Sequence, residues 1–278
     1  MMKNRKIVID ADSLIYQSCF NTACSVDELP EDEQADEVDL PTSVNEALEE
    51  SIRAFQAKVN EIVYSVATRY KDIDTEPIIV ITVKEGSEKC KHLEPNYRYS
   101  VMQGVEDIDV KGYKAKRREQ EIPEGLLELY NWVYDQPNTI CEGGVEADDV
   151  CVYMGSQGHL VCALDKDVIG SLPEAYNYGK KEWTSRTELE IRQFPYLQTI
   201  MGDASDGLRG VFKVGIKGAE KAIKNKETDI EMWTAVVTEY FKKGQTLEEA
   251  VATMLCVRMD MWTPDDGITY WTPPKKGK

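Results

Sequence analysis

Histidine is almost absent from this chain: only His92 and His159 occur in 278 residues, and neither stands at a recognisable ligand spacing. The seven cysteines, at positions 19, 24, 90, 141, 151, 162 and 256, form no C-x-x-C pair. Structural zinc sites and histidine-based catalytic triads need such residues, so both are disfavoured. An odd number of cysteines is typical of reduced thiols, and we expect those at 151 and 162 to be small core residues.

Long hydrophobic runs are also missing. No apolar segment approaches the ~20 residues that a membrane-spanning helix needs. The chain starts with a basic and then apolar stretch, Met1 to Ile9, but Asp10 and Asp12 end it too early for a signal peptide. We therefore expect a cytoplasmic protein with no membrane partner.

Basic residues are absent from one stretch. Residues 27–50 hold eleven acids and no Lys or Arg, so the rest of the chain carries only −6 of the formal net charge of −17. Within this stretch, 25–41 is predicted to be an acidic loop. A polyanion partner needs only a local basic surface, so the net charge does not exclude nucleic acid.

Strand-like and helix-like segments alternate over the first two thirds of the chain. We expect strands at Arg5 to Ile9, Pro77 to Val83, 138–141 and His159 to Leu164, with helices between them. This alternation predicts an α/β fold with a central, mostly parallel sheet and helices on both faces. Past Arg186 the pattern is helical, at 187–202, 217–225, 228–243 and 246–260.

Acidic side chains follow the expected strands. Asp10 ends the first strand, the run Glu146-Ala147-Asp148-Asp149 follows the third, and Asp165-Lys166-Asp167 follows the fourth. A further pair stands at Asp203-Ala204-Ser205-Asp206. Ligands bind outside the carboxyl ends of strands in such sheets, and carboxylates gathered there cannot all stay ionised without a cation. A single acidic run is more often just a stabilised helix N-terminus, but the additional pairs favour a metal site.

Two familiar ion-binding loops fail on their spacing. A calcium loop starting at Asp165 would need ligands where Ile169 and Tyr176 stand. The glycine-rich stretch from Gly210 lacks the lysine and hydroxyl of a nucleotide-phosphate loop. That stretch still predicts a tight turn between helices, and its backbone N–H groups and lysines are suited to a phosphate.

The densest basic cluster is Lys111-Gly112-Tyr113-Lys114-Ala115-Lys116-Arg117-Arg118. Such a cluster is often only a solvated helix face. Together with nearby lysines and tyrosines it also fits a segment that grips a phosphodiester backbone, with Tyr113 among the rings on which bases could stack.

In their order along the chain these pieces resemble the 5′-to-3′ exonuclease/flap endonuclease family, particularly its bacteriophage members. The resemblance spans residues 7–223 and rests on six motifs: 8–12, 94–97, 112–117, 146–149, 164–167 and 202–207. It implies a PIN-like nuclease domain at 1–185 with a basic arch at 84–121. A helical DNA-binding region at 186–278 would follow, with a helix–hairpin–helix-like element at 207–220.

The resemblance also implies a site. Two carboxylate clusters would bind two or more Mg²⁺ ions, with Mn²⁺ as a substitute: Asp10, Glu146, Asp148 and Asp149 in the first, and Asp165, Asp167, Asp203 and Asp206 in the second. Hard oxygen ligands are those that Mg²⁺ prefers, and paired ions suit phosphodiester hydrolysis. Lys114 and Arg117 would contact the scissile phosphate, and the implied nucleic-acid contacts are Tyr113, Lys116, Arg118, Lys213, Gly215 and Lys217.

The implied partner is DNA with 5′ ends or flaps, with RNA/DNA hybrid as a further substrate, in the host cytoplasm for a phage-encoded protein. A monovalent cation at the hairpin is also compatible with the resemblance. Lys84 departs from the pattern, because it falls where the family has an aspartate after the second core strand. Two alternatives therefore stay open: a non-catalytic DNA-binding relative with a degraded first metal site, and a PIN-like ribonuclease.

Overall fold

A six-stranded sheet with the order β3-β2-β1-β4-β5-β6 forms the centre of the protein. The computed structural model describes residues 5–23, 44–103, 113–114 and 122–275. The strands are β1 (Arg5–Asp10), β2 (Ile73–Val80), β3 (Thr139–Ile140), β4 (Leu160–Ala163), β5 (Glu174–Asn177) and β6 (Glu182–Ser185). All neighbours are parallel except β5 and β6. Because the order reverses between β1 and β4, their carboxyl ends form a topological switch point.

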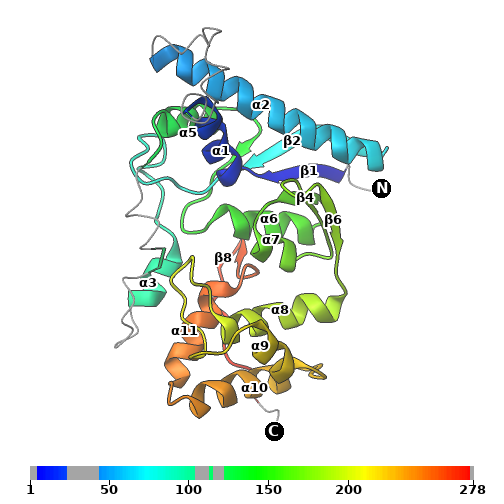
Figure 1. The fold of residues 1–278 in the computed structure, drawn as a ribbon, viewed down its shortest axis with the longest axis vertical. Helices are drawn as coiled ribbons and strands as arrows, with labels where there is room; N and C mark the ends of the chain where they lie inside the picture. The colour runs from blue at the N-terminus through cyan, green and yellow to red at the C-terminus, as the bar shows by residue number, and fades with distance from the viewer. Residues whose placement is uncertain (1–4, 24–43, 104–112, 115–121, 276–278) are drawn as a thin grey trace, which may run out of the picture.

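Helices cover both faces of this sheet (Figure 1). One face packs Ile7 and Ile9 against α1 (Asp12–Ala23), α2 (Val44–Arg69) and α5 (Leu126–Tyr134). The other packs Val8 against α6 (Ala147–Ser156) and α7 (Lys166–Gly170). Successive side chains of a strand point to opposite faces, so Asp10 lies on the same face as Val8, the face that α6 covers.

The helical region beyond the sheet has a core of its own (Figure 1, lower half). It consists of α8 (Glu188–Met201), α9 (Ile216–Ile223), α10 (Asp229–Lys242) and α11 (Leu247–Val257). Three of these helices, α8, α10 and α11, begin at capping boxes in which a threonine and a glutamate three residues later satisfy each other's N–H groups. The sequence-based prediction of four helices in this region is confirmed.

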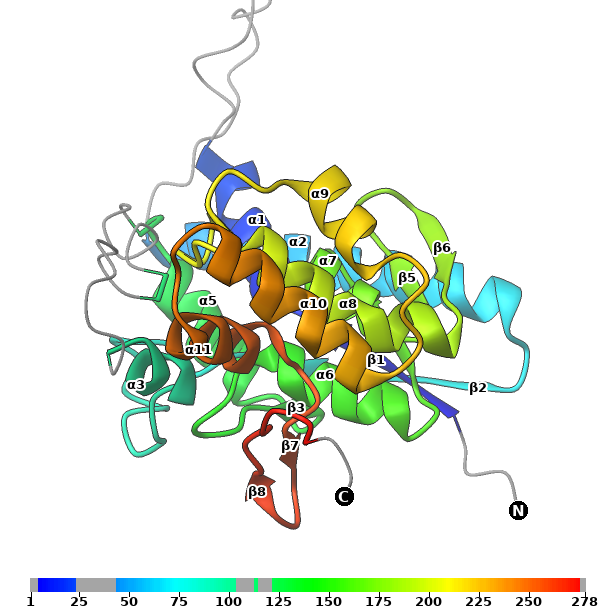
Figure 2. The same cartoon turned by 90° about the horizontal axis from the view of Figure 1, so that it is seen from below.

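Two connections tie the helical region to the sheet. Helix α3 (Tyr97–Gln103) packs against α11. After α11 the chain returns, and Met259, Met261 and Trp262 join the core under α6. The hairpin of β7 (Trp262–Thr263) and β8 (Gly267–Ile268) projects beside this contact in Figure 2.

Several local expectations need correction. Strand β2 begins at Ile73 and ends at Val80, earlier than the apolar run suggested, because its first half pairs with the polar start of β1. The hairpins β5–β6 and β7–β8 were not expected. The arch segment 84–121 was expected to hold few core positions, but Arg98 and Tyr113 are among its buried residues. The acidic loop 25–41 lies outside the described residues.

None of the helices in the described part of the chain is both long enough and apolar enough to cross a membrane. The six cysteines in that part form no disulfide with one another, and Cys151 and Cys162 are buried, as expected of small core residues.

The turn that follows α8 requires glycine. Gly202 has a φ of 70°, and a Cβ there would lie 2.4 Å from the carbonyl oxygen of Leu208. Gly244 has a similar φ of 71°, but a Cβ there would meet nothing within 4 Å. Gly244→Ala is therefore expected to cost about 1 kcal/mol from its backbone conformation alone. Gly202→Ala should cost about 3 kcal/mol or more, because backbone must also move.

Urea unfolding of the two variants measures this difference. Equal losses of stability would show that the turn between Gly202 and Leu208 is not closely packed.

Candidate active site

The first carboxylate cluster forms where β1 meets the start of α6. Asp10 is 3% exposed, and burial raises its pKa to about 8, with further increases from the charges of Asp12 and Asp165. Burial also raises the pKa of Asp148 well above its ordinary value, and the charges of Asp10 and Asp165 add to the shift. These carboxylates come from three distant parts of the chain and lie close enough to repel one another.

Asp12 also belongs to this cluster, although the sequence reasoning did not include it in the ligand set. Burial raises its pKa, while hydrogen bonds from Thr82 oppose the shift. The Thr82 N–H donates to Asp12 Oδ1 at 3.0 Å, and the Thr82 hydroxyl accepts from the Ala147 N–H at 2.9 Å. Thr82 thus joins the residues after β2 to the starts of α1 and α6. The sequence feature that could have identified Asp12 as a cluster member is its position two residues after Asp10, in the same motif.

The second cluster lines a cavity of about 370 Å³ beside the end of β4. The acids of this cluster share the cavity with two serines, a leucine and a lysine; the lining residues are Ser13, Leu164, Asp165, Lys166, Asp167, Asp203, Ser205 and Asp206. Asp165 is the N-cap of α7 and accepts from the Asp167 N–H at 2.8 Å. All four residues expected in this cluster therefore meet around one cavity.

Asp167 and Asp203 have opposite environments. Burial and the charge of Asp165 raise the pKa of Asp167 to about 7. Burial would also raise the pKa of Asp203, but hydrogen bonds from Lys166 and Ser205 outweigh it and lower that pKa. Lys166 Nζ lies 2.6 Å from Asp203 Oδ2. Asp203 therefore carries its charge against the partly exposed ammonium of Lys166, whereas Asp167 lacks comparable compensation.

Lys114 places a positive charge beside the first cluster. Burial alone would lower its pKa, but the charges of Glu146 and Asp206 outweigh burial and raise it. Its ammonium pairs with Glu146, and its charge also opposes the raised pKa values of Asp10, Asp12 and Asp148. Lys114 adopts a φ of 53°, and its N–H donates to the Asp206 carbonyl at 2.9 Å.

Tyr113 does not have the environment expected of a base-stacking residue. It is 2% exposed, and its hydroxyl lies 2.9 Å from Glu146 Oε2 and 3.2 Å from Asp206 Oδ2. Its ring is enclosed in the core with Tyr99 at an edge-to-face angle. The structure therefore corrects the expected stacking role. The buried Tyr113 hydroxyl bridges Glu146 of the first cluster and Asp206 of the second. The other arch residues predicted to contact nucleic acid, Lys116, Arg117 and Arg118, lie outside the described residues.

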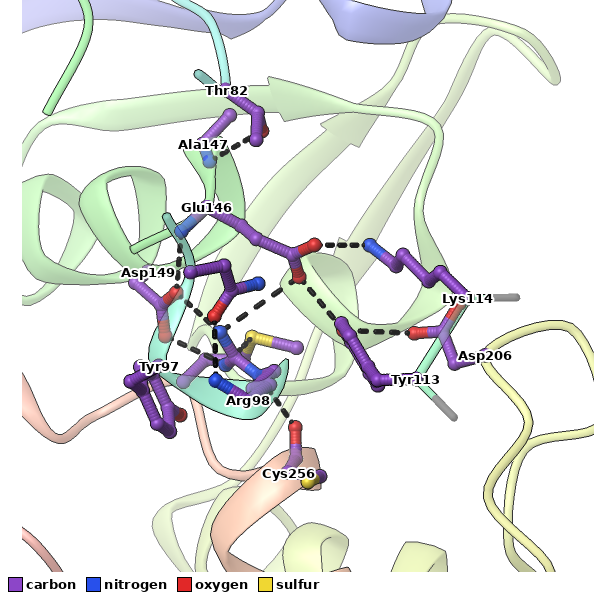
Figure 3. Close-up of polar contacts among 12 residues, drawn as sticks. Thr82, Tyr97, Arg98, Tyr113, Lys114, Glu146, Ala147, Asp149, Asp206 and Cys256 are labelled. Carbon is purple, nitrogen blue, oxygen red and sulfur yellow. Dashed lines mark hydrogen bonds and ion pairs between the residues drawn. The ribbon is translucent and has the colours of Figure 1, made fainter. Parts of the chain in front are cut away.

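Asp149 is held by a buried guanidinium. Both of its carboxylate oxygens accept from Arg98, at 2.7 and 2.8 Å, and Oδ2 also accepts from the Glu146 N–H at 3.0 Å (Figure 3). Glu146 is the N-cap of α6, and its backbone carbonyl accepts from the Asp149 N–H at 3.1 Å. Asp149, one of the eight predicted metal ligands, thus has both carboxylate oxygens bound by the Arg98 guanidinium.

The donor set of the two clusters suits a hard divalent ion. It consists of carboxylates, and their raised pKa values indicate anionic crowding that a cation would relieve. As the side chains stand, no three His, Cys, Asp or Glu residues in the described ranges are arranged so that they could hold an ion. Lys114 and Lys166 occupy one carboxylate of each cluster instead.

Lys84 lies in the loop after β2, and its carbonyl accepts from the Ser87 N–H at 3.1 Å. The residue after β2 that bonds to the first cluster is Thr82, a neutral side chain. After β2 the chain therefore has a neutral residue, Thr82, bonded to Asp12, and a lysine at position 84, where the family has an aspartate.

The predicted hairpin residues lie on the exposed turn before α9 and in the first turn of that helix. Lys213, Gly215 and Lys217 are all exposed, and Lys213 adopts a φ of 57°. Gly215 is the N-cap of α9 and offers no side-chain cap, and a Cβ there would meet nothing within 4 Å. This open helix start with two lysines is compatible with the predicted phosphate contact.

Comparison with solved structures identifies the fold. A bacteriophage T5 flap endonuclease variant, described as a pseudo-enzyme–product complex with DNA and metal ions, matches with a TM-score of 0.59 at 15% identity. The match covers 92% of this chain and 89% of that one. The T5 protein co-crystallised with metal ions gives a TM-score of 0.57 at 14% identity, covering 92% and 90%.

This chain has the 5′-nuclease fold. The T5 5′-exonuclease with bound zinc also matches, with a TM-score of 0.56 at 15% identity over 91% and 89% of the two chains. These proteins belong to the family that the six motifs resemble. No family model and no curated protein matches the sequence. At this identity the likeness establishes the fold alone.

The crowding of carboxylates predicts an unusual pH dependence for the metal-free protein. Asp10 has a pKa of about 8 when folded and an ordinary value of 3.8, so the folded state binds its proton more tightly. Stability from this group is fully present below about pH 4 and is lost as the pH rises toward 8. Urea unfolding in a chelator should therefore show a lower free energy of unfolding at pH 8 than at pH 5.

Asp10→Asn is the control, because its curve should be flatter over the same range. A wild-type stability that rises from pH 5 to pH 8 would contradict the buried position of Asp10.

Proposed function

We propose that this protein is a divalent-metal-dependent 5′-to-3′ exonuclease/flap endonuclease that hydrolyses DNA phosphodiester bonds by a two-metal mechanism. The observation that carries the proposal is the convergence of acids from four separate chain segments at the switch point of the sheet. Neighbours with this fold are described with metal ions, and one with DNA. Both features support a metal-dependent nuclease.

The residues that would hold the metal ions are the carboxylates of the two clusters. Asp10, Asp12, Glu146 and Asp148 line the first, and Asp165, Asp167, Asp203 and Asp206 the second. Bound Mg²⁺ or Mn²⁺ would supply an activated water and neutralise the charge that develops on the phosphate.

The chain's own groups would orient this site and hold the substrate. Tyr113 fixes Glu146 and Asp206 relative to each other through its hydroxyl. Lys114 places an ammonium beside the first cluster, where it would offset phosphate charge. The exposed Lys213, Gly215 and Lys217 would contact the duplex backbone, and such contacts carry no base specificity. DNA with 5′ ends or flaps is the expected substrate, and RNA/DNA hybrid is a second one to test.

Purified protein given Mg²⁺ or Mn²⁺ and 5′-labelled duplex or flap DNA should release short 5′ products. Asp148→Ala and Asp165→Ala should lower the cleavage rate by more than about a hundredfold, because ligand loss exceeds the effect of outer partners. Both variants should still bind DNA. Asp135→Ala, an exposed acid at the end of α5 that pairs with Lys89, is the matched control and should cleave normally. Wild-type inactivity with both metals would rule out the proposal.

A non-catalytic DNA-binding role is the second candidate. It is favoured by the two lysines that pair with carboxylates of the clusters, and by Lys84 at the position expected to be acidic. Lys84→Asp separates the two roles in the same cleavage assay. A rise from near-zero activity supports the non-catalytic role of the natural protein, whereas little change or a loss supports the nuclease.

A further inference from the structure

Arg98 is a completely buried arginine whose donors are almost all used. It lies in α3, with a relative exposure of 0%. Its Nη1 and Nη2 atoms donate to the two oxygens of Asp149. Its Nε donates to the Cys256 carbonyl at 2.7 Å, and Nη2 donates to the Arg258 carbonyl at 2.8 Å (Figure 3). A planar guanidinium can donate to the Asp149 carboxylate and to these carbonyls at the same time, which a lysine ammonium cannot.

On one side, this guanidinium fixes the first turn of α6. Asp149 accepts from the Glu146 N–H while it is held by Arg98, and the Asp149 N–H donates to the Glu146 carbonyl at 3.1 Å in the same turn. Arg98 Nη1 also lies 3.8 Å from Glu146 Oε2. The direction of Glu146 and Asp148 into the first cluster therefore depends on where Arg98 holds Asp149.

On the other side, Arg98 satisfies the end of α11. The last carbonyls of a helix have no partner within the helix. Here the carbonyls of Cys256 and Arg258 accept from Arg98, and that of Leu255 accepts from the Tyr97 hydroxyl at 3.0 Å. Helix α11 belongs to the helical core, so the Arg98 side chain connects that core to the carboxylate site.

We propose that Arg98 is a positioning residue that holds Asp149 as the anchor of α6, and not as a metal ligand, and so places Glu146 and Asp148 for metal binding. The inference deepens the proposed nuclease function and rests on it. Both oxygens of Asp149 are directed at a fully buried cation, and withdrawing either partner would leave an unpaired buried charge. The set of direct ligands in the first cluster is thereby reduced to carboxylates other than Asp149.

The test is a double-mutant cycle of Arg98→Lys, Asp149→Asn and the two together, read by Mn²⁺ titration of the metal-free protein without DNA. We expect each single change to weaken Mn²⁺ binding about tenfold and the double change to weaken it no further, because both act through one contact. In cleavage assays kcat should fall while KM for DNA stays within about twofold. Arg5→Met is the matched control, since it breaks the Arg5–Glu174 pair at the start of β1 and should leave Mn²⁺ binding unchanged.

Two results overturn the inference. If the losses in Mn²⁺ affinity multiply in the double variant, Asp149 is itself a ligand. If Mn²⁺ affinity stays within twofold while the melting temperature falls, Arg98 has only a structural role.

If the variants do not fold, Arg98→Met combined with Asp149→Leu removes both charges and restores an apolar interior. This protein should fold and bind Mn²⁺ about tenfold more weakly, and wild-type affinity would refute the positioning role. Wild-type protein that binds Mn²⁺ but cleaves no DNA would remove the nuclease proposal and leave the Arg98 cycle intact. Absence of Mn²⁺ binding would remove both.

Discussion

Electrostatic repulsion among buried carboxylates is the constraint on which the rest of this structure depends. A parallel sheet that reverses its order between β1 and β4 brings strand ends from distant parts of the chain to one edge. This chain places acids at those ends, and Asp10, Asp148 and Asp165 all act on one another there. Such an arrangement costs stability in the metal-free protein, and that cost is typical of a site kept for function.

The surrounding side chains are arranged to control that repulsion. Lys114 pairs with Glu146 in the first cluster, and Lys166 pairs with Asp203 in the second. Arg98 forms a buried ion pair with Asp149. Their burial differs in an informative way: Arg98 is fully enclosed, whereas the Lys166 side chain is 63% exposed. An exposed lysine is displaced by a stronger cation at little cost, but a buried arginine is not. The Lys166–Asp203 pair is therefore suited to exchange with a metal ion, and the Arg98–Asp149 pair to a permanent structural role.

The fold class and the gathering of acids could be predicted from the sequence because both depend on local signals. Alternating apolar segments predict the parallel sheet, and acids directly after them predict the site. The roles of Arg98 and Tyr113 could not be predicted in this way. Arg98 meets Cys256, 158 residues away, and Tyr113 meets Asp206, 93 residues away. In the sequence both stand in a polar, basic segment, and nothing local distinguishes a buried arginine or tyrosine from one that faces DNA. The two hairpins were missed because their strands are only two to four residues long.

The most direct test is a crystal structure of the protein soaked in Mn²⁺, with the ions located by anomalous scattering. We predict ions between Asp10, Asp148 and Asp165 and in the cavity lined by Asp167 and Asp203, with Lys166 displaced from Asp203 and the Arg98–Asp149 pair unchanged. Saturating Mn²⁺ that leaves both clusters without an anomalous peak would contradict this prediction.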